Sequence, residues 1–221
     1  FSKFSNLFSA IFSFKFNFEL KFLLPCFHKK HLYLDLTMKN NFSERRLKLS
    51  DKVLEDSAII VASALVKARI SDTDYAYRQD SNFYYLSGYE EPDSLLLIRP
   101  NSDKEKFIIF CRDRDPLREQ WDGFRTGQEG AVQQYGADNA YSINSLDQMM
   151  PDLLAGVKNI YFSMSAPSGI DTKISQWMED IRKNTRAGAE PPQNLLSLDS
   201  ILHEMRLIKE DHEMNLMKKA A

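Results

Sequence analysis

The chain's candidates for metal binding or nucleophilic attack are its histidines and cysteines, namely Cys26, His28, His31, Cys111, His203 and His212. The last two histidines fall on polar helix faces without the His-x-x-x-His spacing that brings two imidazoles together. The first three residues form a short cluster, but Lys29 and Lys30 lie within it and would repel a cation. Cys111 lies in an apolar run with no histidine nearby to activate its thiol. These patterns predict neither a catalytic residue nor a metal site in this chain.

The composition of the chain indicates which kinds of molecule it is not suited to bind. The formal net charge of −2 favours neither nucleic acid nor an anionic membrane surface. Cys26 and Cys111 match no metal-binding or redox spacing, so a reduced, cytoplasmic setting is the simplest interpretation, and a disulfide between them is the alternative. We therefore expect no nucleic-acid and no membrane partner.

Residues 1–37 differ in composition from the rest of the chain. They contain nine of the fifteen phenylalanines, and five lysines against only Glu19 and Asp35. Charged and polar residues interrupt every apolar run, so the segment matches neither a signal peptide nor a transmembrane helix. Because the first methionine is Met38, we expect residues 1–37 to be a spurious or disordered leader, translated from DNA upstream of the true start. A basic, aromatic membrane anchor is the alternative.

Apolar runs alternate with helical stripes in the remaining chain, which predicts an α/β fold with a mixed β-sheet flanked by helices. Strands are expected at residues 57–64, 94–99, 106–111 and 157–163. Helices are expected at residues 42–55, 81–86, 126–135, 145–154 and 199–208, and others are expected to begin at Asp115, Asp171 and Asp211. Ser43 and Ser81 are the predicted N-caps of the first two helices, Asp171 is the cap of its own helix, and Gly88 and Gly136 are stop signals. The predicted division is a domain at 38–193 and a linker with one further helix at 194–221.

The most distinctive stretch runs from Arg78 to Pro92 and reads RQDSNFYYLSGYEEP. Further blocks follow in order, namely Asp93–Leu97, Arg112–Pro116, Trp121–Gly123, Arg125–Gly127 and Met205–Lys209. Several ordered blocks are far more specific than one short motif. Together they resemble the N-terminal domain of the Xaa-Pro aminopeptidases (aminopeptidase P), and the resemblance extends from residue 42 to residue 221.

The resemblance implies an aminopeptidase P/creatinase-type N-terminal domain, followed by the start of a linker helix to a catalytic domain that lies beyond these residues. In that family the catalytic domain holds two divalent metal ions, usually manganese, and releases an N-terminal residue that precedes proline. The implied partners are a peptide with proline at its second position and further copies of the chain. We expect this chain alone to be inactive and to bind no metal, and to serve oligomerisation and construction of the substrate groove.

Tyr84 or Tyr85 is the predicted substrate-binding residue, because an exposed aromatic ring suits a groove that accepts peptide and proline rings. Ordinary packing against a core is the alternative for both. Arg78, Asp72 and Asp80 are expected to be structural, through a buried Arg–Asp pair. Glu210 stands where the family usually has a Ser or Thr cap, and Asp211 is expected to cap that helix instead.

Three other interpretations of the chain stay open. One is a non-catalytic, peptidase-like module that binds peptides or proteins. Another is a prolidase-type relative, against which the block from Trp121 to Gly127 favours aminopeptidase P. The third is a broken gene whose product has no function. The presence or loss of metal ligands downstream of residue 221 distinguishes the enzyme from the module.

Overall fold

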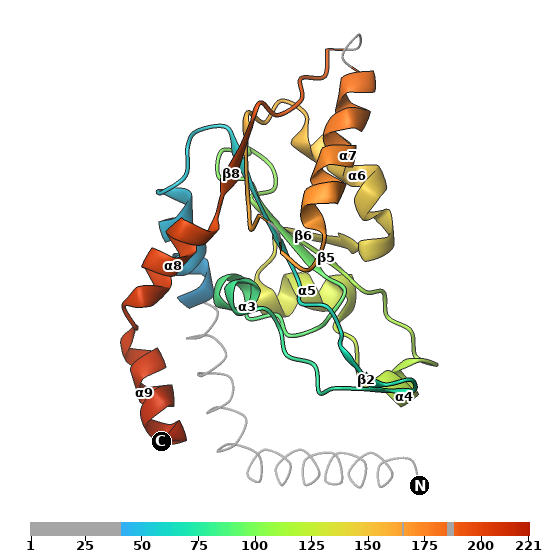
Figure 1. Cartoon of the computed structure of the whole chain (residues 1–221), viewed down its shortest axis with the longest axis vertical. Coiled ribbons are helices and arrows are strands. Elements are labelled where there is room, and N and C mark those ends of the chain that lie inside the picture. The colour runs from blue at the N-terminus through green and yellow to red at the C-terminus, as the bar shows by residue number, and fades with distance from the viewer. Residues whose placement is uncertain (1–40, 165, 185–187) are drawn as a thin grey trace, which may run out of the picture. The chain divides into compact units, whose positions relative to one another are not determined.

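The computed structural model describes residues 41–164, 166–184 and 188–221, so the expectations for residues 1–37 lie outside the described part of the chain. Its centre is a six-stranded sheet with the order β6-β5-β4-β1-β7-β8 (Figure 1). The strands are β1 (Ser57–Ala62), β4 (Leu95–Ile98), β5 (Phe107–Cys111), β6 (Asn139–Ser142), β7 (Asn159–Phe162) and β8 (Asn194–Ser197). β4 runs antiparallel to β1 and β5, and the other neighbouring pairs are parallel. The predicted mixed sheet is confirmed.

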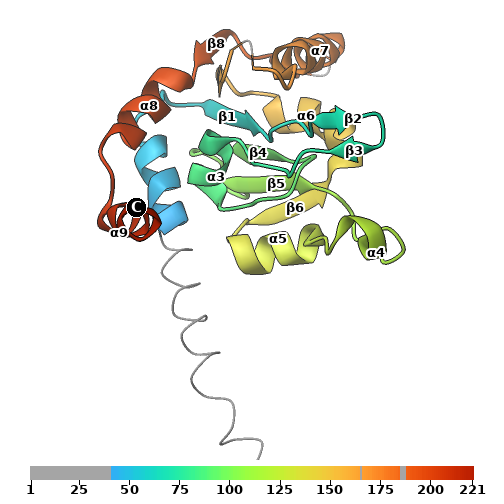
Figure 2. The same ribbon diagram turned by 60° about the horizontal axis from the view of Figure 1, so that its bottom comes forward.

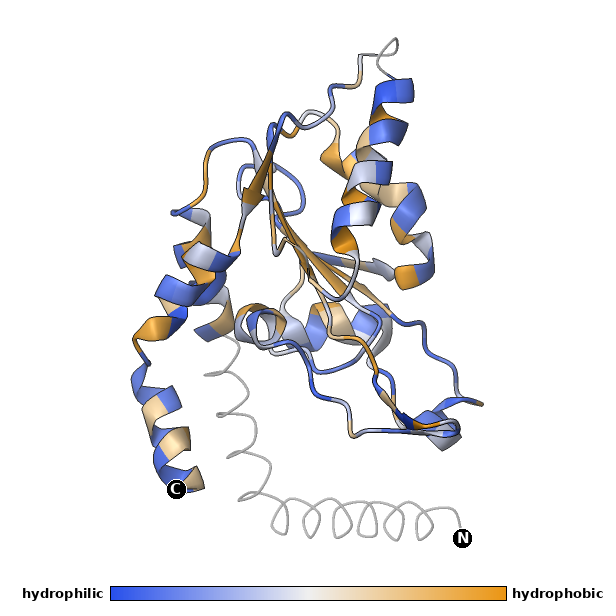
Figure 3. Ribbon diagram, viewed as in Figure 1, coloured by the Kyte–Doolittle hydropathy of each residue, from blue (hydrophilic) through white to orange (hydrophobic). Residues whose placement is uncertain are grey.

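The central strands are buried on both faces. In β1, Ile59 and Val61 belong to one core, whereas Ala58 and Ile60 belong to the core on the opposite face. This division follows from the alternation of side chains along a strand. Every residue of β4 and β5 is buried, as their continuous apolar runs predict. The hydrophobic colour of these strands is visible in Figure 3.

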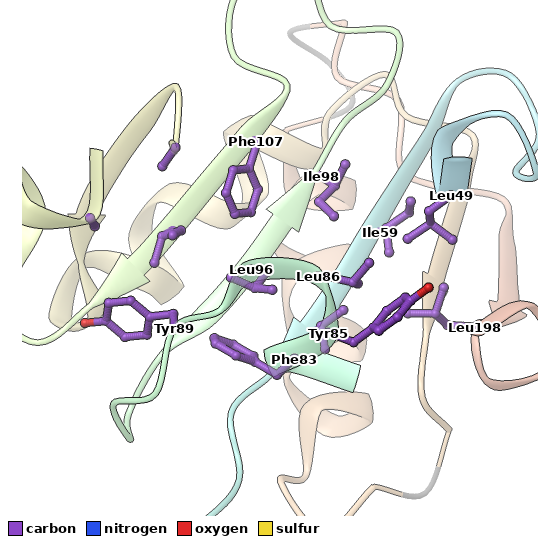
Figure 4. Close-up of a cluster of buried hydrophobic side chains, with 14 of the residues drawn as sticks. Leu49, Ile59, Phe83, Tyr85, Leu86, Tyr89, Leu96, Ile98, Phe107 and Leu198 are labelled. Atoms are coloured by element: carbon purple, nitrogen blue, oxygen red, sulfur yellow. The ribbon is translucent and has the colours of Figure 1, made fainter. Parts of the chain in front are cut away.

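Helices cover both faces of the sheet (Figures 1 and 2). One core contains side chains from the helix of residues 41–50, from α3 (Ser81–Ser87), α5 (Gly127–Tyr135) and α8 (Asp199–Leu207) (Figure 4). The other core contains side chains from α6 (Leu146–Leu154) and α7 (Ile170–Lys183), and a short 3-10 helix, η1 (Ile143–Ser145), precedes α6. The apolar residues of α7 form one buried stripe, namely Ile174, Trp177, Met178 and Ile181.

Four strands were not expected from the sequence. β6 and β8 are the two edges of the sheet, and neither strand is mostly buried. β2 (Ala68–Ile70) and β3 (Thr73–Asp74) pair in a separate two-stranded sheet whose residues are all exposed. Edge and exposed strands lack the long apolar runs that mark a buried strand, so a hydrophobicity pattern does not reveal them.

Several predicted helix starts are wrong by one or more residues. The first helix already includes residue 41, so Ser43 is not its cap, and it ends at residue 50 instead of 55. Asp80 replaces Ser81 as the cap of α3, and Gly169 replaces Asp171 at α7. The turn after Asp115 becomes helical only at α4 (Glu119–Asp122). Asp, Ser and Gly all suit cap positions, so neighbouring candidates compete and tertiary contacts choose between them.

The last helix, α9 (Asp211–Ala220), is capped by Glu210 and not by the expected Asp211. Among the helices in the described part of the chain, none has the length and apolar character needed to span a membrane.

Candidate functional site

The Arg78–Pro92 stretch builds α3 and the turns on either side of it. The Asp80 carboxylate accepts hydrogen bonds of 2.9 Å from the backbone N–H groups of Asn82 and Phe83, which caps the helix. Gly88 ends the helix with φ of 68°, a conformation that favours glycine. A Cβ at Gly88 would lie 2.4 Å from Cε2 of Phe42, so the helix terminus also needs glycine for space. The predicted stop at Gly88 is confirmed.

Gln79 connects three parts of the chain. Its side-chain oxygen accepts a 2.9 Å hydrogen bond from the backbone N–H of Ala64, just after β1, and its amide nitrogen donates to the Glu91 carbonyl at 3.0 Å. The Tyr77 hydroxyl donates to the same side-chain oxygen at 2.9 Å. Burial raises the pKa of Tyr77 to about 12, so this hydroxyl keeps its proton at neutral pH. The Tyr77–Gln79 segment therefore has an architectural role.

The expected Arg–Asp pair is not formed within the described residues. Arg78 and Asp72 are both exposed, and neither is joined to the other or to Asp80 by an ion pair in the described part of the chain. The Asp80 carboxylate is instead used by the helix cap. A local backbone donor two residues away satisfies this acid more readily than a long guanidinium side chain.

The two tyrosines predicted to contact substrate lie in different environments. The Tyr84 side chain is 37% exposed and meets the Phe42 ring edge-on, with centroids 5.8 Å apart. Tyr85 is only 7% exposed, and the Arg45 guanidinium lies 4.1 Å from its ring centroid. Its hydroxyl donates to the Met205 carbonyl at 3.3 Å. Tyr84 is thus the one of the pair with a surface available to another molecule, and its role in substrate binding stays a prediction.

Trp121 is an exposed aromatic residue that belongs to one of the blocks resembling the aminopeptidase P family, and the sequence assigned it no other role. It is 88% exposed in α4, within a loop that also exposes Leu117 at 77% and Phe124 at 65%. A bidentate ion pair holds this loop in shape, because Arg114 donates to both carboxylate oxygens of Glu119 at 2.6 and 2.9 Å. This ordered loop therefore exposes three large apolar side chains. In the sequence, Trp121 stands in a mostly polar segment and is followed closely by Gly123.

A pocket of about 520 Å³ opens where the parallel strands β1 and β7 end. Its lining includes Ser63, Tyr77, Gln79, Ser163 and Ile170. Ligands in open α/β sheets often bind beyond the carboxyl ends of parallel strands. Tyr77 and Gln79 already bond each other, so their polar atoms stabilise the wall of this pocket.

In the described residues, neither a reactive thiol nor a metal-binding cluster is found. Burial raises the pKa of the Cys111 thiol to about 11, and no part of Cys111 is exposed, so it is a poor nucleophile at neutral pH. Across residues 41–164, 166–184 and 188–221, no three His, Cys, Asp or Glu side chains are close enough to share a metal ion. The two divalent ions implied by the resemblance therefore have no fitting donor set there.

Known proteins resemble this chain in both sequence and structure. Residues 42–161 match the model of the aminopeptidase P N-terminal domain. The Xaa-Pro aminopeptidase of Haemophilus influenzae is 36% identical over 85% of this chain and 41% of its own length. That of Escherichia coli is 30% identical over 82% of this chain and 42% of its own length. The chain thus spans about two fifths of these curated relatives.

Solved structures agree with the sequence matches. The Pseudomonas aeruginosa aminopeptidase PepP superposes with a TM-score of 0.79 at 38% identity, over 81% of this chain and 40% of that one. A variant Escherichia coli aminopeptidase P in complex with substrate superposes with a TM-score of 0.78 at 30% identity, over 82% of this chain and 42% of that one. This chain belongs to the aminopeptidase P family, and residues 42–161 are the family's N-terminal domain.

Proposed function

We propose that this chain supplies the N-terminal domain of an Xaa-Pro aminopeptidase, a metallopeptidase that releases an N-terminal residue preceding proline. The match of residues 42–161 to the family's N-terminal domain carries the proposal, because the relatives that share it are named Xaa-Pro aminopeptidases. The substrate would be a peptide with proline at its second position. Two divalent ions, which we expect to be manganese, would supply an activated hydroxide when bound elsewhere in the enzyme.

These 221 residues would not hydrolyse peptides by themselves. Support comes from the comparisons, because the chain spans only about two fifths of the relatives named Xaa-Pro aminopeptidases. The domain division at residues 38–193 and 194–221 stays part of the proposal. β8 and Leu202 of α8 belong to the same sheet and core as the residues before them, so the linker would begin within a packed element.

The domain's own contribution would be self-association and one wall of a substrate groove. The exposed side chains of Leu117, Trp121 and Phe124 support this role, because large apolar side chains on a soluble domain favour contact with another molecule. Tyr84 offers a second exposed aromatic surface for a peptide or proline ring. The expected partner on the Trp121 loop is a second copy of the chain. A cytoplasmic location completes the proposal, and cell fractionation tests it.

Two measurements on the purified chain test this assignment. With manganese and an Xaa-Pro peptide, release of the N-terminal residue should be undetectable, whereas a longer protein carrying the downstream domain should cleave the same peptide. Release of the N-terminal residue by the chain alone would contradict the proposal that the downstream domain performs the hydrolysis. Failure of the longer protein to cleave, despite binding the peptide, would favour the non-catalytic module.

Sedimentation analysis tests the self-association. Trp121→Ala should shift the chain toward monomer, because it removes the most exposed apolar side chain of the loop. Leu47→Ala is the matched control, since Leu47 is 64% exposed on the helix of residues 41–50, away from that loop. A chain that is monomeric at all concentrations, or equal effects of the two variants, would contradict the proposed surface.

A further inference from the structure

Within the last helix of the described chain, the partly buried residues all lie in the first turn. Residues 214–221 are all exposed, whereas Glu210, His212 and Glu213 are partly buried. Ile208 and Lys209 separate α8 from the Glu210 cap, and Ile208 is 81% exposed. Within the residues that the structure describes, apolar packing therefore does not set the direction of α9, and the contacts of its first turn must do so.

Those contacts converge on one buried guanidinium. Nη2 of Arg45 lies 3.0 Å from the Glu210 carboxylate, 3.1 Å from that of Glu213 and 3.2 Å from Nε2 of His212. The Arg45 side chain is only 4% exposed, while the two carboxylates are 28% and 25% exposed. Lys48, one turn further along the same helix, adds a contact of 3.3 Å to Glu210. The acids at the start of α9 thus face a cation that is almost fully buried.

Arg45 itself is fixed by the core. Its Nη1 donates to the Tyr85 carbonyl at 3.3 Å, and its guanidinium lies 4.1 Å from the Tyr85 ring centroid. The Tyr85 hydroxyl reaches the Met205 carbonyl of α8. Arg45 therefore has a defined position relative to both α3 and α8. It cannot follow α9 outward without losing these contacts, so it is a rigid anchor for the acids.

Glu210 also caps the N-terminus of α9. It is the N-cap of α9 in a capping box, with its side chain accepting from the Glu213 backbone and the Glu213 side chain accepting from the Glu210 N–H at 2.9 Å. Ser could perform this capping but could not reach and neutralise Arg45. Burial raises the pKa of Glu210, but Arg45 and then Lys48 outweigh it, so the pKa is lowered overall.

We propose that Glu210, acting through Arg45, is a positioning residue that fixes the direction in which α9 leaves the domain. Removing its charge leaves Arg45 buried with fewer partners and frees the first turn of α9, while the helix itself stays formed. If α9 begins the next domain, a consequence that rests on the proposed function, this contact sets how the two domains are oriented. The test below needs only this chain, so its result is independent of peptidase activity.

The test separates the charge of Glu210 from its capping. The variant Glu210→Ser/Glu213→Gln keeps a Ser-x-x-Gln capping box but removes both acids that face Arg45. The matched control is Asp211→Asn, which removes an exposed acid from the same turn that makes no ion pair with Arg45 in the described structure. Paired spin labels at Gln134→Cys on α5 and Lys218→Cys on α9 report the direction of α9. Cys26→Ser removes the other thiol, and buried Cys111 stays.

The wild type and Asp211→Asn should each give one narrow distance population, and Glu210→Ser/Glu213→Gln should lose it in favour of a broad one. Hydrogen exchange should show equal protection of the α9 amides in all three proteins. An unchanged distance distribution would overturn the proposal. Broadening that comes with lost α9 protection would overturn it as well, because the acids would then act by forming the helix. The single variant Glu210→Ser should give an intermediate width, since Glu213 still reaches Arg45.

Discussion

The carboxylate of Glu91 accepts a 2.6 Å hydrogen bond from the backbone N–H of Thr126, 35 residues later in the chain. Its other oxygen lies 3.3 Å from the Arg112 guanidinium, and both side chains are largely buried. Glu91 therefore closes the loop of residues 112–126 onto the turn that follows α3. The loop that exposes Trp121 is held at both ends by a single acid from the Arg78–Pro92 stretch.

Glu91→Ala should destabilise the domain by about 2–4 kcal/mol, because it leaves the buried Thr126 N–H and Arg112 without this partner. Urea denaturation measures the free energy of unfolding. The neighbouring Glu90→Ala is the matched control, since Glu90 is exposed, and its effect should stay within about 0.5 kcal/mol. Similar losses for the two variants would show that Glu91 does not hold the loop.

Gly88→Ala should cost more stability than Gly136→Ala. Both glycines end helices at nearly the same positive φ, 68° and 67°, so each substitution costs about 1–2 kcal/mol of backbone strain. Only at Gly88 does the new Cβ collide with a ring, that of Phe42 at 2.4 Å; at Gly136 the nearest atom is 4.0 Å away. The collision should add about 1–3 kcal/mol. Equal unfolding free energies for the two variants would mean that the Phe42 ring moves aside without cost.

Asp147→Asn should lower stability at neutral pH and have a smaller effect at pH 3. The Lys173 ammonium donates to both Asp147 oxygens at 2.8 Å, and Trp177 donates to one of them, so the pKa of Asp147 is lowered. A carboxyl with a lowered folded-state pKa stabilises above its unfolded pKa of about 3.9, and this contribution is lost as the pH falls through the folded-state value. Because the pair is exposed, the loss at pH 7 should be about 0.3–1 kcal/mol.

Unfolding free energies of the wild type and Asp147→Asn, measured at pH 7 and pH 3, test this pH dependence. Asp152→Asn serves as the control, since Asp152 is exposed on the same helix. If Asp147→Asn lost more unfolding free energy at pH 3 than at pH 7, the stabilising role of the ionised Asp147 carboxylate would be refuted.

Tyr85→Ala should destabilise the domain much more than Tyr84→Ala. Tyr85 is 7% exposed and supports Arg45, so its removal should cost about 3–5 kcal/mol. Tyr84 is 37% exposed and loses chiefly its edge contact with Phe42, worth about 0.5–1.5 kcal/mol. Thermal unfolding of both variants measures the difference. In the longer enzyme, a raised KM for Tyr84→Ala at unchanged stability would support its predicted role in the groove, and an unchanged KM would count against it.

The strongest local patterns of the sequence predicted their elements well. The apolar runs predicted as strands are buried in β1, β4, β5 and β7, and the apolar stripe of α7 is buried as well. An uninterrupted apolar segment is stable chiefly in the core, because exposing it to water is unfavourable. Edge strands β6 and β8 escaped prediction since their residues are half polar and gain strand structure only from the neighbour they pair with.

The first helix shows the limit of pattern reasoning. A helical hydrophobicity pattern predicts that Leu47 faces the core, yet Leu47 is 64% exposed, and Arg45 and Arg46 are buried instead. Arg46 donates to the Leu86 carbonyl at 2.8 Å and stacks over Phe107, so its charge is satisfied by residues far away in the sequence. Burial lowers the pKa of Arg46 to about 10, which leaves it charged at neutral pH. A hydrophobicity pattern cannot anticipate such partners.

The amino-acid sequence by itself determined the family, the mixed α/β class and the glycine that ends α3, because ordered motifs and backbone requirements are local properties of the chain. Only the tertiary structure decided which acids have partners. Glu91 bonds Thr126, and Glu210 bonds Arg45 across 165 residues. It also decided that Tyr84, and not Tyr85, keeps an exposed ring. Such choices depend on which distant donors the fold brings within hydrogen-bonding distance, and sequence spacing does not contain those distances.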